Sequence, residues 1–217
     1  MEQQGSSSQA PLLPPGAAHT IFEGTSLWLE LPALQSAVDW CASEMLLSAH
    51  PAHLTLLYNL PAREAGYYDE LRRLGDRLRG GGWALSLRPT GLKAGVSGLF
   101  HHGFADLFFA AEGGLAALFE EAMAVFEHRT HAESFAGAPH ACLAYARDPA
   151  PFEDGSFERA LRERHPGLLK RPLAAEVCHV ALWRTQGTTA EWRRLARIEL
   201  RAEGPPAAAD ACGHVVL

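Results

Sequence analysis

Two short segments, each led by a proline, carry histidine, a small polar residue and tyrosine at the same spacing. The first reads PAHLTLLY and contains His53 and Thr55; the second reads APHACLAY and contains His140 and Cys142. Residues i and i+2 of a strand project from the same face, so each histidine shares a face with the polar residue after it. The two histidines are 87 residues apart (140 − 53). That separation predicts equivalent strands in two similar lobes.

Two imidazoles facing each other across a cleft supply what acid–base catalysis at phosphorus requires. An unperturbed histidine has a pKa near 6.5, so one ring can accept a proton while the other donates one. The hydroxyl of Thr55 can donate a hydrogen bond to a phosphoryl oxygen as negative charge builds there. The pattern fits hydrolysis of a cyclic phosphodiester, in which one histidine activates water and the other protonates the departing ribose oxygen. No metal or other cofactor is needed, and the motifs leave open which histidine is the base.

Other histidines of the chain have a simpler interpretation. His128-Arg129-Thr130 repeats the His-x-Thr pattern, but at the end of a predicted helix, where residues i and i+2 do not share a face. We interpret it as a solvated helix end. A metal site drawn from His101, His102, His128 and His131 lacks carboxylates or cysteines at zinc spacing, so loop histidines are favoured.

Cys142 raises a second alternative, a cysteine nucleophile. It stands two residues from His140, but it shares the face of that neighbour and the sequence offers no third group to orient the pair. The four cysteines lie far apart with no CxxC pair, which fits neither a disulfide framework nor a zinc module.

Short apolar runs that alternate with helical patterns must position the two motifs. The pairs of neighbouring runs at 83–110 and 177–200 favour antiparallel pairing, so we predict an α+β fold, with mainly antiparallel sheets flanked by helices around a central cleft. Residues 91–103 are predicted to be a mobile loop near the cleft, where Lys93 could hold a diphosphate. The predicted strands are 26–31, 53–58, 83–87, 106–110, 140–145, 177–184 and 194–200, and the predicted helices 33–49, 64–79, 115–126 and 157–163.

Composition narrows the class of protein further. The chain has 217 residues, 47% hydrophobic and 20% charged, with a formal net charge of −6, which disfavours a protein that coats long nucleic acid. Residues 1–19 and 202–217 read as flexible tails around one domain at 20–201. The absence of a secretory signal and of an apolar run of membrane-spanning length predicts a cytoplasmic protein with no membrane partner. We expect a monomer.

Four segments resemble the 2H phosphoesterases, and within them the cyclic phosphodiesterase branch. SLWL at 26–29 resembles the opening strand of that family, and His53-Leu54-Thr55 its first signature. PHACLAY at 139–145 resembles the second signature, usually written PHxSLxY. LWRTQG at 182–187, continued by EW at 191–192, resembles the closing hairpin. These segments span about residues 26–200.

The resemblance implies a bilobal, pseudo-symmetric α+β fold with both motifs in a central cleft. It implies hydrolysis of nucleoside 2′,3′-cyclic phosphates, or of ADP-ribose 1″,2″-cyclic phosphate, a by-product of tRNA splicing. His53 and His140 would be the catalytic acid–base pair. Thr55 and position 142 would contact the phosphate, and Tyr145 would form a wall of the substrate pocket. The partner is therefore expected to be a small phosphorylated nucleotide.

One position departs from the family pattern. Cys142 stands where the family has serine or threonine, and a thiol is a weaker hydrogen-bond donor than a hydroxyl. Reduced turnover is the expected consequence, because both histidines are present. The same substitution keeps open a non-catalytic member of the fold that binds a nucleotide or an RNA end without hydrolysing it.

Overall fold

A computed structural model describes residues 24–201, apart from 46–47, 62, 81–84, 97–102, 130–131, 147, 171, 175–176 and 188. Both predicted tails, 1–19 and 202–217, lie outside these residues. Within them the chain is an α+β protein with a seven-stranded antiparallel sheet and six α-helices. The same described part contains no helix both long and apolar enough to cross a membrane.

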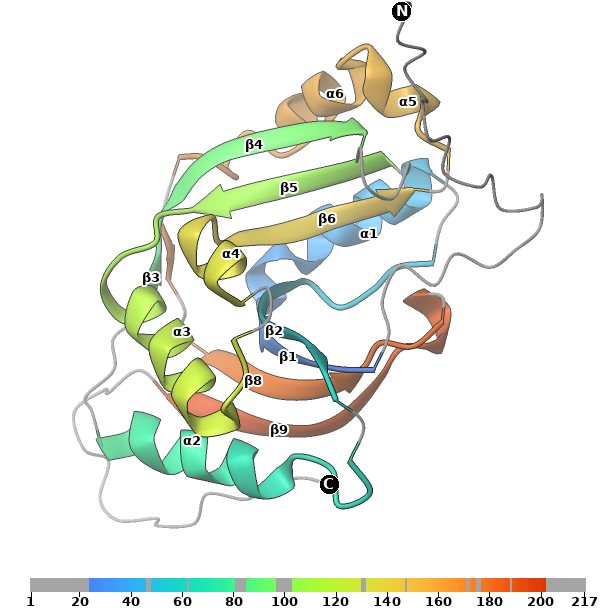
Figure 1. The fold of residues 1–217 in the computed structure, drawn as a ribbon. Coiled ribbons are helices and arrows are strands. Elements are labelled where there is room, and N and C mark those ends of the chain that lie inside the picture. Colours follow the sequence, from blue (N-terminus) through green and yellow to red (C-terminus); the bar gives the residue numbers. More distant parts are fainter. Residues whose placement is uncertain are drawn as a thin grey trace, which may run out of the picture.

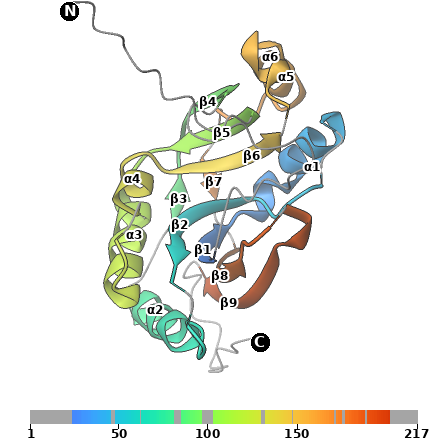
Figure 2. The same ribbon diagram turned by 45° about the vertical axis from the view of Figure 1, so that its right-hand side comes forward.

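The large sheet consists of two groups of strands, which Figures 1 and 2 show above and below one another. The strand order is β4-β5-β6-β2-β1-β8-β9, and β3 and β7 form a separate two-stranded sheet. In β5, buried residues alternate with half-buried ones, as expected for a strand with one face in the core. The bounds are β1 Thr25–Glu30, β2 His53–Leu60, β3 Ser86–Leu87, β4 Pro89–Val96, β5 Gly103–Phe109, β6 His140–Ala146, β7 Leu173–Ala174, β8 Val177–Arg184 and β9 Arg193–Arg201.

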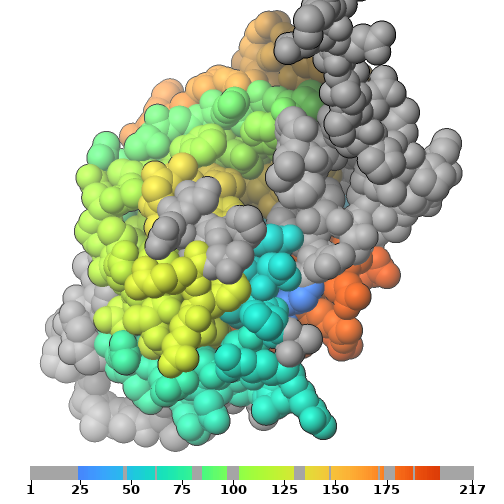
Figure 3. All heavy atoms as spheres, in the orientation of Figure 1, coloured from blue at the N-terminus to red at the C-terminus, as the bar shows by residue number. Residues whose placement is uncertain are grey.

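Helices cover the apolar face of this sheet. Helix α2 packs on β9 and α3, α3 packs on β2 and α4, α1 packs on β6, and α5 and α6 pack on β4. In the space-filling view, α2, α3 and α4 form a continuous band along one side of the molecule (Figure 3). The bounds are α1 Gln35–Glu44, α2 Tyr68–Gly80, α3 Gly113–Phe126, α4 Ala132–Gly137, α5 Ala150–Glu153 and α6 Ser156–Arg164, with 3-10 turns at Pro32–Leu34 and Thr189–Glu191.

The two groups of strands meet at a single residue pair. Strands β2 and β6 are antiparallel, and their only paired residues are Leu54 and Ala141. The neighbouring pair β5–β6, in contrast, is in register from Gly103 opposite Ala146 to Phe108 opposite His140. The group β4-β5-β6 therefore ends on the strand with the second motif, and the group β9-β8-β1-β2 ends on the strand with the first.

Three predictions about elements were wrong. Residues 91–103 are not a loop throughout: residues 89–96 form β4, which pairs along its length with β5, while 97–102 lie outside the described residues. Gly91 and Gly95 suggested a loop because glycine is depleted in strands, but cross-strand pairing outweighs that preference. Of the strand predicted at 83–87, residues 83–84 lie outside the described residues, and Ser86–Leu87 pair with β7 rather than with β5. The helix predicted at 33–49 ends at Glu44. The predicted antiparallel pairing within 177–200 is confirmed by β8 and β9.

Candidate functional site

Each of the two motif histidines makes the same kind of hydrogen bond to the backbone. The Nδ1–H of His53 donates to the carbonyl oxygen of Pro51 at 2.7 Å, and the Nδ1–H of His140 donates to that of Ala138 at 2.9 Å. In both cases the acceptor lies two residues earlier in the chain. Since each Nδ1 carries the proton, each Nε2 of the neutral ring is left as the atom that can accept one. Both rings thus have Nε2 as the atom that can take part in proton transfer.

The register of the sheet brings both motifs onto one patch of one face. Leu54 and Ala141, the only pair between β2 and β6, are each the residue after the motif histidine. His53 and Thr55 flank this pair on β2, and His140 and Cys142 flank it on β6. Because the flanking residues on both strands project to the same side of the sheet, these four side chains share one face beside the junction. An electrostatic effect of His140 on the pKa of His53 agrees with this proximity.

The ring of His53 is enclosed by aromatic side chains. Only 2% of the residue is exposed, and the indole of Trp28 stacks on its imidazole with 3.5 Å between ring centroids and 11° between planes. Trp28 in turn stacks on Trp183 at 5.0 Å. Burial, followed by the repulsion that a protonated His50 would exert on a second imidazolium, lowers the pKa of His53 to about 3 despite the opposing effect of its hydrogen bond to Pro51. His53 is therefore neutral at pH 7.

His50 belongs to the same cluster, although it lies outside both sequence motifs. It is 4% exposed, and its Nε2–H donates to the backbone carbonyl of Cys142 at 3.2 Å, which links the segment before β2 to β6. Its ring centroid lies 5.7 Å from that of His53 and 5.2 Å from that of Tyr145. Burial lowers its pKa to about 4. His50 thus reinforces the narrow junction between the two groups of strands with a neutral imidazole.

His140 lies in a more open setting. It is half-buried between the rings of Phe108 on β5 and Phe135 on α4, whose centroids are 5.5 and 5.6 Å from its own. Phe108 is its direct partner across β5 and β6. The two matched histidines therefore differ in surroundings: one is sealed under an indole, and the other is exposed in part between two phenyl rings.

Cys142 and Tyr145 lie in a hydrogen-bonded group that includes Asp106. The Sγ atom of Cys142 donates to the carbonyl of Ala144 at 3.0 Å, and the thiol also hydrogen-bonds to the side chains of Asp106 and Tyr145. Burial, with the charge of Asp106 adding to it, holds the pKa of the Cys142 thiol well above its ordinary value. Burial likewise raises the pKa of the Tyr145 hydroxyl. A thiol kept protonated in this way is a poor nucleophile, which argues against the cysteine mechanism.

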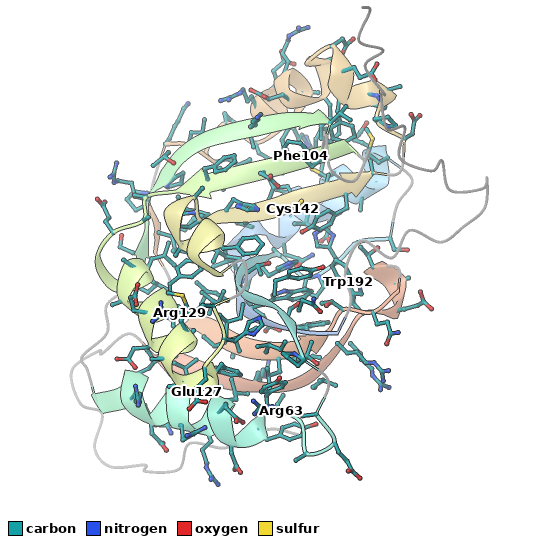
Figure 4. All side chains as sticks on the ribbon, viewed as in Figure 1. Arg63, Phe104, Glu127, Arg129, Cys142 and Trp192 are labelled. Atoms are coloured by element: carbon teal, nitrogen blue, oxygen red, sulfur yellow. The ribbon has the colours of Figure 1, made fainter. Side chains whose placement is uncertain are left out.

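Tyr145 also borders the tryptophan cluster. Its ring centroid lies 5.9 Å from that of Trp192 in an edge-on arrangement. Figure 4 shows Cys142 on β6, Phe104 on the adjacent strand β5, and Trp192 in the region between β6 and the pair β8–β9. Trp28, Trp183 and Trp192 pack together, and Trp28 and Trp192 also contact the site histidines.

The structure thus brings all five predicted site residues together, and it adds His50, Trp28 and Asp106. Trp28 faces Thr55 across β1 and β2, and Asp106 faces Cys142 across β5 and β6. Neither assignment could be made without the strand register. Lys93, predicted in a loop near the cleft, is exposed on β4 directly opposite Asp106.

The residues proposed for the alternative metal site are only partly described. His128 lies after α3, where its Nε2–H donates to the carbonyl of Tyr58 at 3.0 Å. His101, His102 and His131 lie outside the described residues. Among the residues that are described, no group of three or more histidine, cysteine, aspartate or glutamate side chains could hold a metal ion.

Comparison with known proteins adds no assignment. No family model matches the chain, and no curated protein shows significant similarity to it.

Proposed function

We propose that this chain hydrolyses small cyclic phosphodiesters, with His53 and His140 as the acid–base pair. The observation that carries the proposal is the matched hydrogen bond from each Nδ1–H to the carbonyl two residues earlier. It leaves two proton-accepting Nε2 atoms on neighbouring strands, beside the hydroxyl of Thr55. The expected substrates are a nucleoside 2′,3′-cyclic phosphate or ADP-ribose 1″,2″-cyclic phosphate.

In the proposed reaction, water adds to phosphorus and the bond from phosphorus to one ribose oxygen breaks. One imidazole takes a proton from the attacking water, and the other, in its protonated form, gives a proton to the departing ribose oxygen. The product is a phosphomonoester, and the two histidines exchange protonation states and are reset by solvent. Thr55 donates a hydrogen bond to a phosphoryl oxygen, and Tyr145 forms a wall beside the substrate.

The environments of the two histidines support a division of these roles. His53 is neutral in the free protein because of its burial, as a general base must be. A bound phosphodiester anion beside it would raise its pKa and strengthen it as a base. The half-buried His140 is then the general acid. This assignment is part of the proposal and goes beyond what the motifs alone suggested.

The fold arrangement favours the same family. We propose that the chain has the bilobal, pseudo-symmetric architecture of the 2H phosphoesterases. Its support is the strand order, in which each group of strands ends on its own motif strand and the two motif strands meet at equivalent residues. Residues 20–201 are the proposed domain, acting as a cytoplasmic monomer on a small phosphorylated nucleotide.

A second candidate function is binding without hydrolysis. The thiol of Cys142 is directed at the Ala144 carbonyl and at Asp106, so Cys142 is a poorer hydrogen-bond donor to a phosphate than a serine would be. A site that holds a phosphorylated nucleotide or RNA end without turnover would need only Thr55 and the aromatic walls.

Turnover of adenosine 2′,3′-cyclic phosphate and of ADP-ribose 1″,2″-cyclic phosphate tests the proposal, with the product phosphate position assigned by ³¹P NMR. We expect His53→Ala and His140→Ala each to lower kcat roughly 100-fold or more, the usual contribution of a general acid or base. His128→Ala is the matched control, because it removes a histidine from the other His-x-Thr triplet, outside the site. Equal rates for all four proteins would leave only the binding function. Loss of the rate on adding a chelator would refute the metal-free mechanism.

A further inference from the structure

Asp106 occupies a position that a phosphate-binding face would be expected to avoid. It lies on β5 directly opposite Cys142, and Phe108, two residues on, lies directly opposite His140. Asp106 therefore projects from the same face as the catalytic pair. A carboxylate at that place would repel an anionic phosphodiester and raise the free energy of binding.

The charged and titratable side chains around Asp106 influence whether its carboxyl group is ionised. Lys93 faces it from β4, and His140, Cys142 and Tyr145 face it from β6, with His50 and His53 beyond the β6–β2 junction. Desolvation raises the pKa of Asp106, while the charges of His140 and Lys93 and the hydrogen bond from Cys142 oppose that effect. The net direction is upward. A carboxylic acid that retains its proton is a hydrogen-bond donor and carries no repelling charge.

The side chain at position 142, in contrast, already uses its only hydrogen-bond donor within the protein. The single thiol proton of Cys142 is directed to the Ala144 carbonyl at 3.0 Å or to the Asp106 carboxyl group. The hydroxyl of Tyr145 donates to the sulfur atom. The hydrogen-bonded group thus runs from Tyr145 through Cys142 to Asp106. Of these three residues, Asp106 in its protonated form is the one whose proton can be donated to a ligand.

We propose that Asp106, in its protonated form, donates the hydrogen bond to the phosphoryl group that a serine or threonine at position 142 would otherwise donate. Residues directly opposite in an antiparallel pair have Cβ atoms about 5 Å apart, so the two side chains can reach the same ligand atom. The inference rests on the proposed function, because it assigns a donor within that site. The proton stays on Asp106, and no bond is formed or broken there.

The test compares Asp106→Ala and Asp106→Asn with the wild type from pH 5 to 8, on adenosine 2′,3′-cyclic phosphate. Asp106→Ala removes the donor, and we expect it to lower kcat/KM roughly 10- to 100-fold at pH 5, as for loss of a hydrogen bond to a charged group. Asp106→Asn keeps an N–H donor and cannot ionise. We expect it to stay within about threefold of the wild type at pH 5 and to lose the wild-type decline caused by Asp106 ionisation.

A second background separates a donor from a structural residue. In Cys142→Ser the hydroxyl supplies the missing donor, so Asp106→Ala should cost much less there than in the wild type. Asp76→Asn, on the exposed face of α2, is the control for the chemical change and should leave the pH profile unaltered. An Asp106→Ala rate within twofold of the wild type at every pH would overturn the proposal, as would a pH profile of Asp106→Asn identical to that of the wild type.

Calorimetric binding of adenosine 2′-monophosphate to the same variants distinguishes the two proposals. If the wild type binds the monophosphate without turning over the cyclic substrate, and Asp106→Ala weakens that binding at pH 5, the donor role stands while the hydrolytic function fails. If the wild type turns over the substrate and Asp106→Ala does not change rate or affinity, the donor role alone fails. Absence of both turnover and binding refutes both.

Discussion

Replacement of His50 by glutamine should make the protein more resistant to mild acid. His50 is 4% exposed, and its pKa is lowered to about 4, mainly by burial. Because the unfolded chain binds a proton at His50 near pH 6.5, while the folded chain does so only near pH 4, acid favours unfolding in between. The stabilising effect is complete above pH 6.5 and is lost as the pH falls toward 4. Glutamine cannot titrate, and its side-chain amide can still donate to the Cys142 carbonyl.

The pKa values of His50 and His53 set the size of the effect. Between pH 7.5 and 5.0, protonation of the unfolded chain at His50 lowers the free energy of unfolding by about 2 kcal/mol, and His53 contributes a similar loss through its pKa of about 3. His50→Gln should therefore remove about half of the loss that the two histidines cause together. The variant is expected to be less stable at pH 7.5, because an amide packs less well than an imidazole against the ring of Tyr145.

Urea unfolding at pH 5.0, 7.5 and 8.5, followed by tryptophan fluorescence, measures these differences. The free-energy difference between wild type and His50→Gln should be constant from pH 8.5 to 7.5, which serves as the internal control, and should change by about 2 kcal/mol in favour of the variant at pH 5.0. A difference that stays the same at all three pH values would show that His50 is not held neutral by the fold.

Two further substitutions probe the site and the packing around it. Cys142→Ser should increase the rate on a cyclic nucleotide by up to about tenfold, because a hydroxyl is a stronger hydrogen-bond donor than a thiol; a rate equal to or below the wild type would contradict the role of position 142. Gly103→Ala should lower the free energy of unfolding by about 1–3 kcal/mol, since a Cβ atom there would overlap the ring of Phe152. Thermal unfolding of Gly103→Ala that matches the wild type would refute this packing argument.

Short apolar runs and proline boundaries predicted the strands that contain the two motifs. The predicted strands at 53–58 and 140–145 correspond to β2 and β6, because their apolar residues are numerous enough to be buried on both sides of the chain. The pairing of His with the residue two positions later could be predicted for the same reason. Strand β4 could not, since Gly91 and Gly95 lower local strand preference and only the partner strand β5 stabilises the extended conformation.

The additional site residues depended on long-range geometry. Asp106 and Cys142 are 36 positions apart (142 − 106), and only the β5–β6 register sets them opposite each other. His50 precedes its strand and has no periodic pattern that would distinguish it from a loop histidine. Trp28 lies in the strand predicted at 26–31, but the stacking of its ring on His53 follows from the pairing of β1 with β2. Local pattern thus predicts elements, whereas neighbours across strands require the fold.

Because the two motif strands meet at equivalent residues, the orientation of a ligand in the proposed site depends on how the two motifs differ. Two identical half-sites would hold an unsymmetrical ligand equally well in either of two opposite orientations. Here the halves differ, because His53 is sealed beneath Trp28 whereas His140 is half-exposed between phenyl rings. The hydroxyl of Thr55 is likewise matched by the thiol of Cys142. In the proposed site, the orientation of a bound nucleotide would therefore follow from the differences between these two strands.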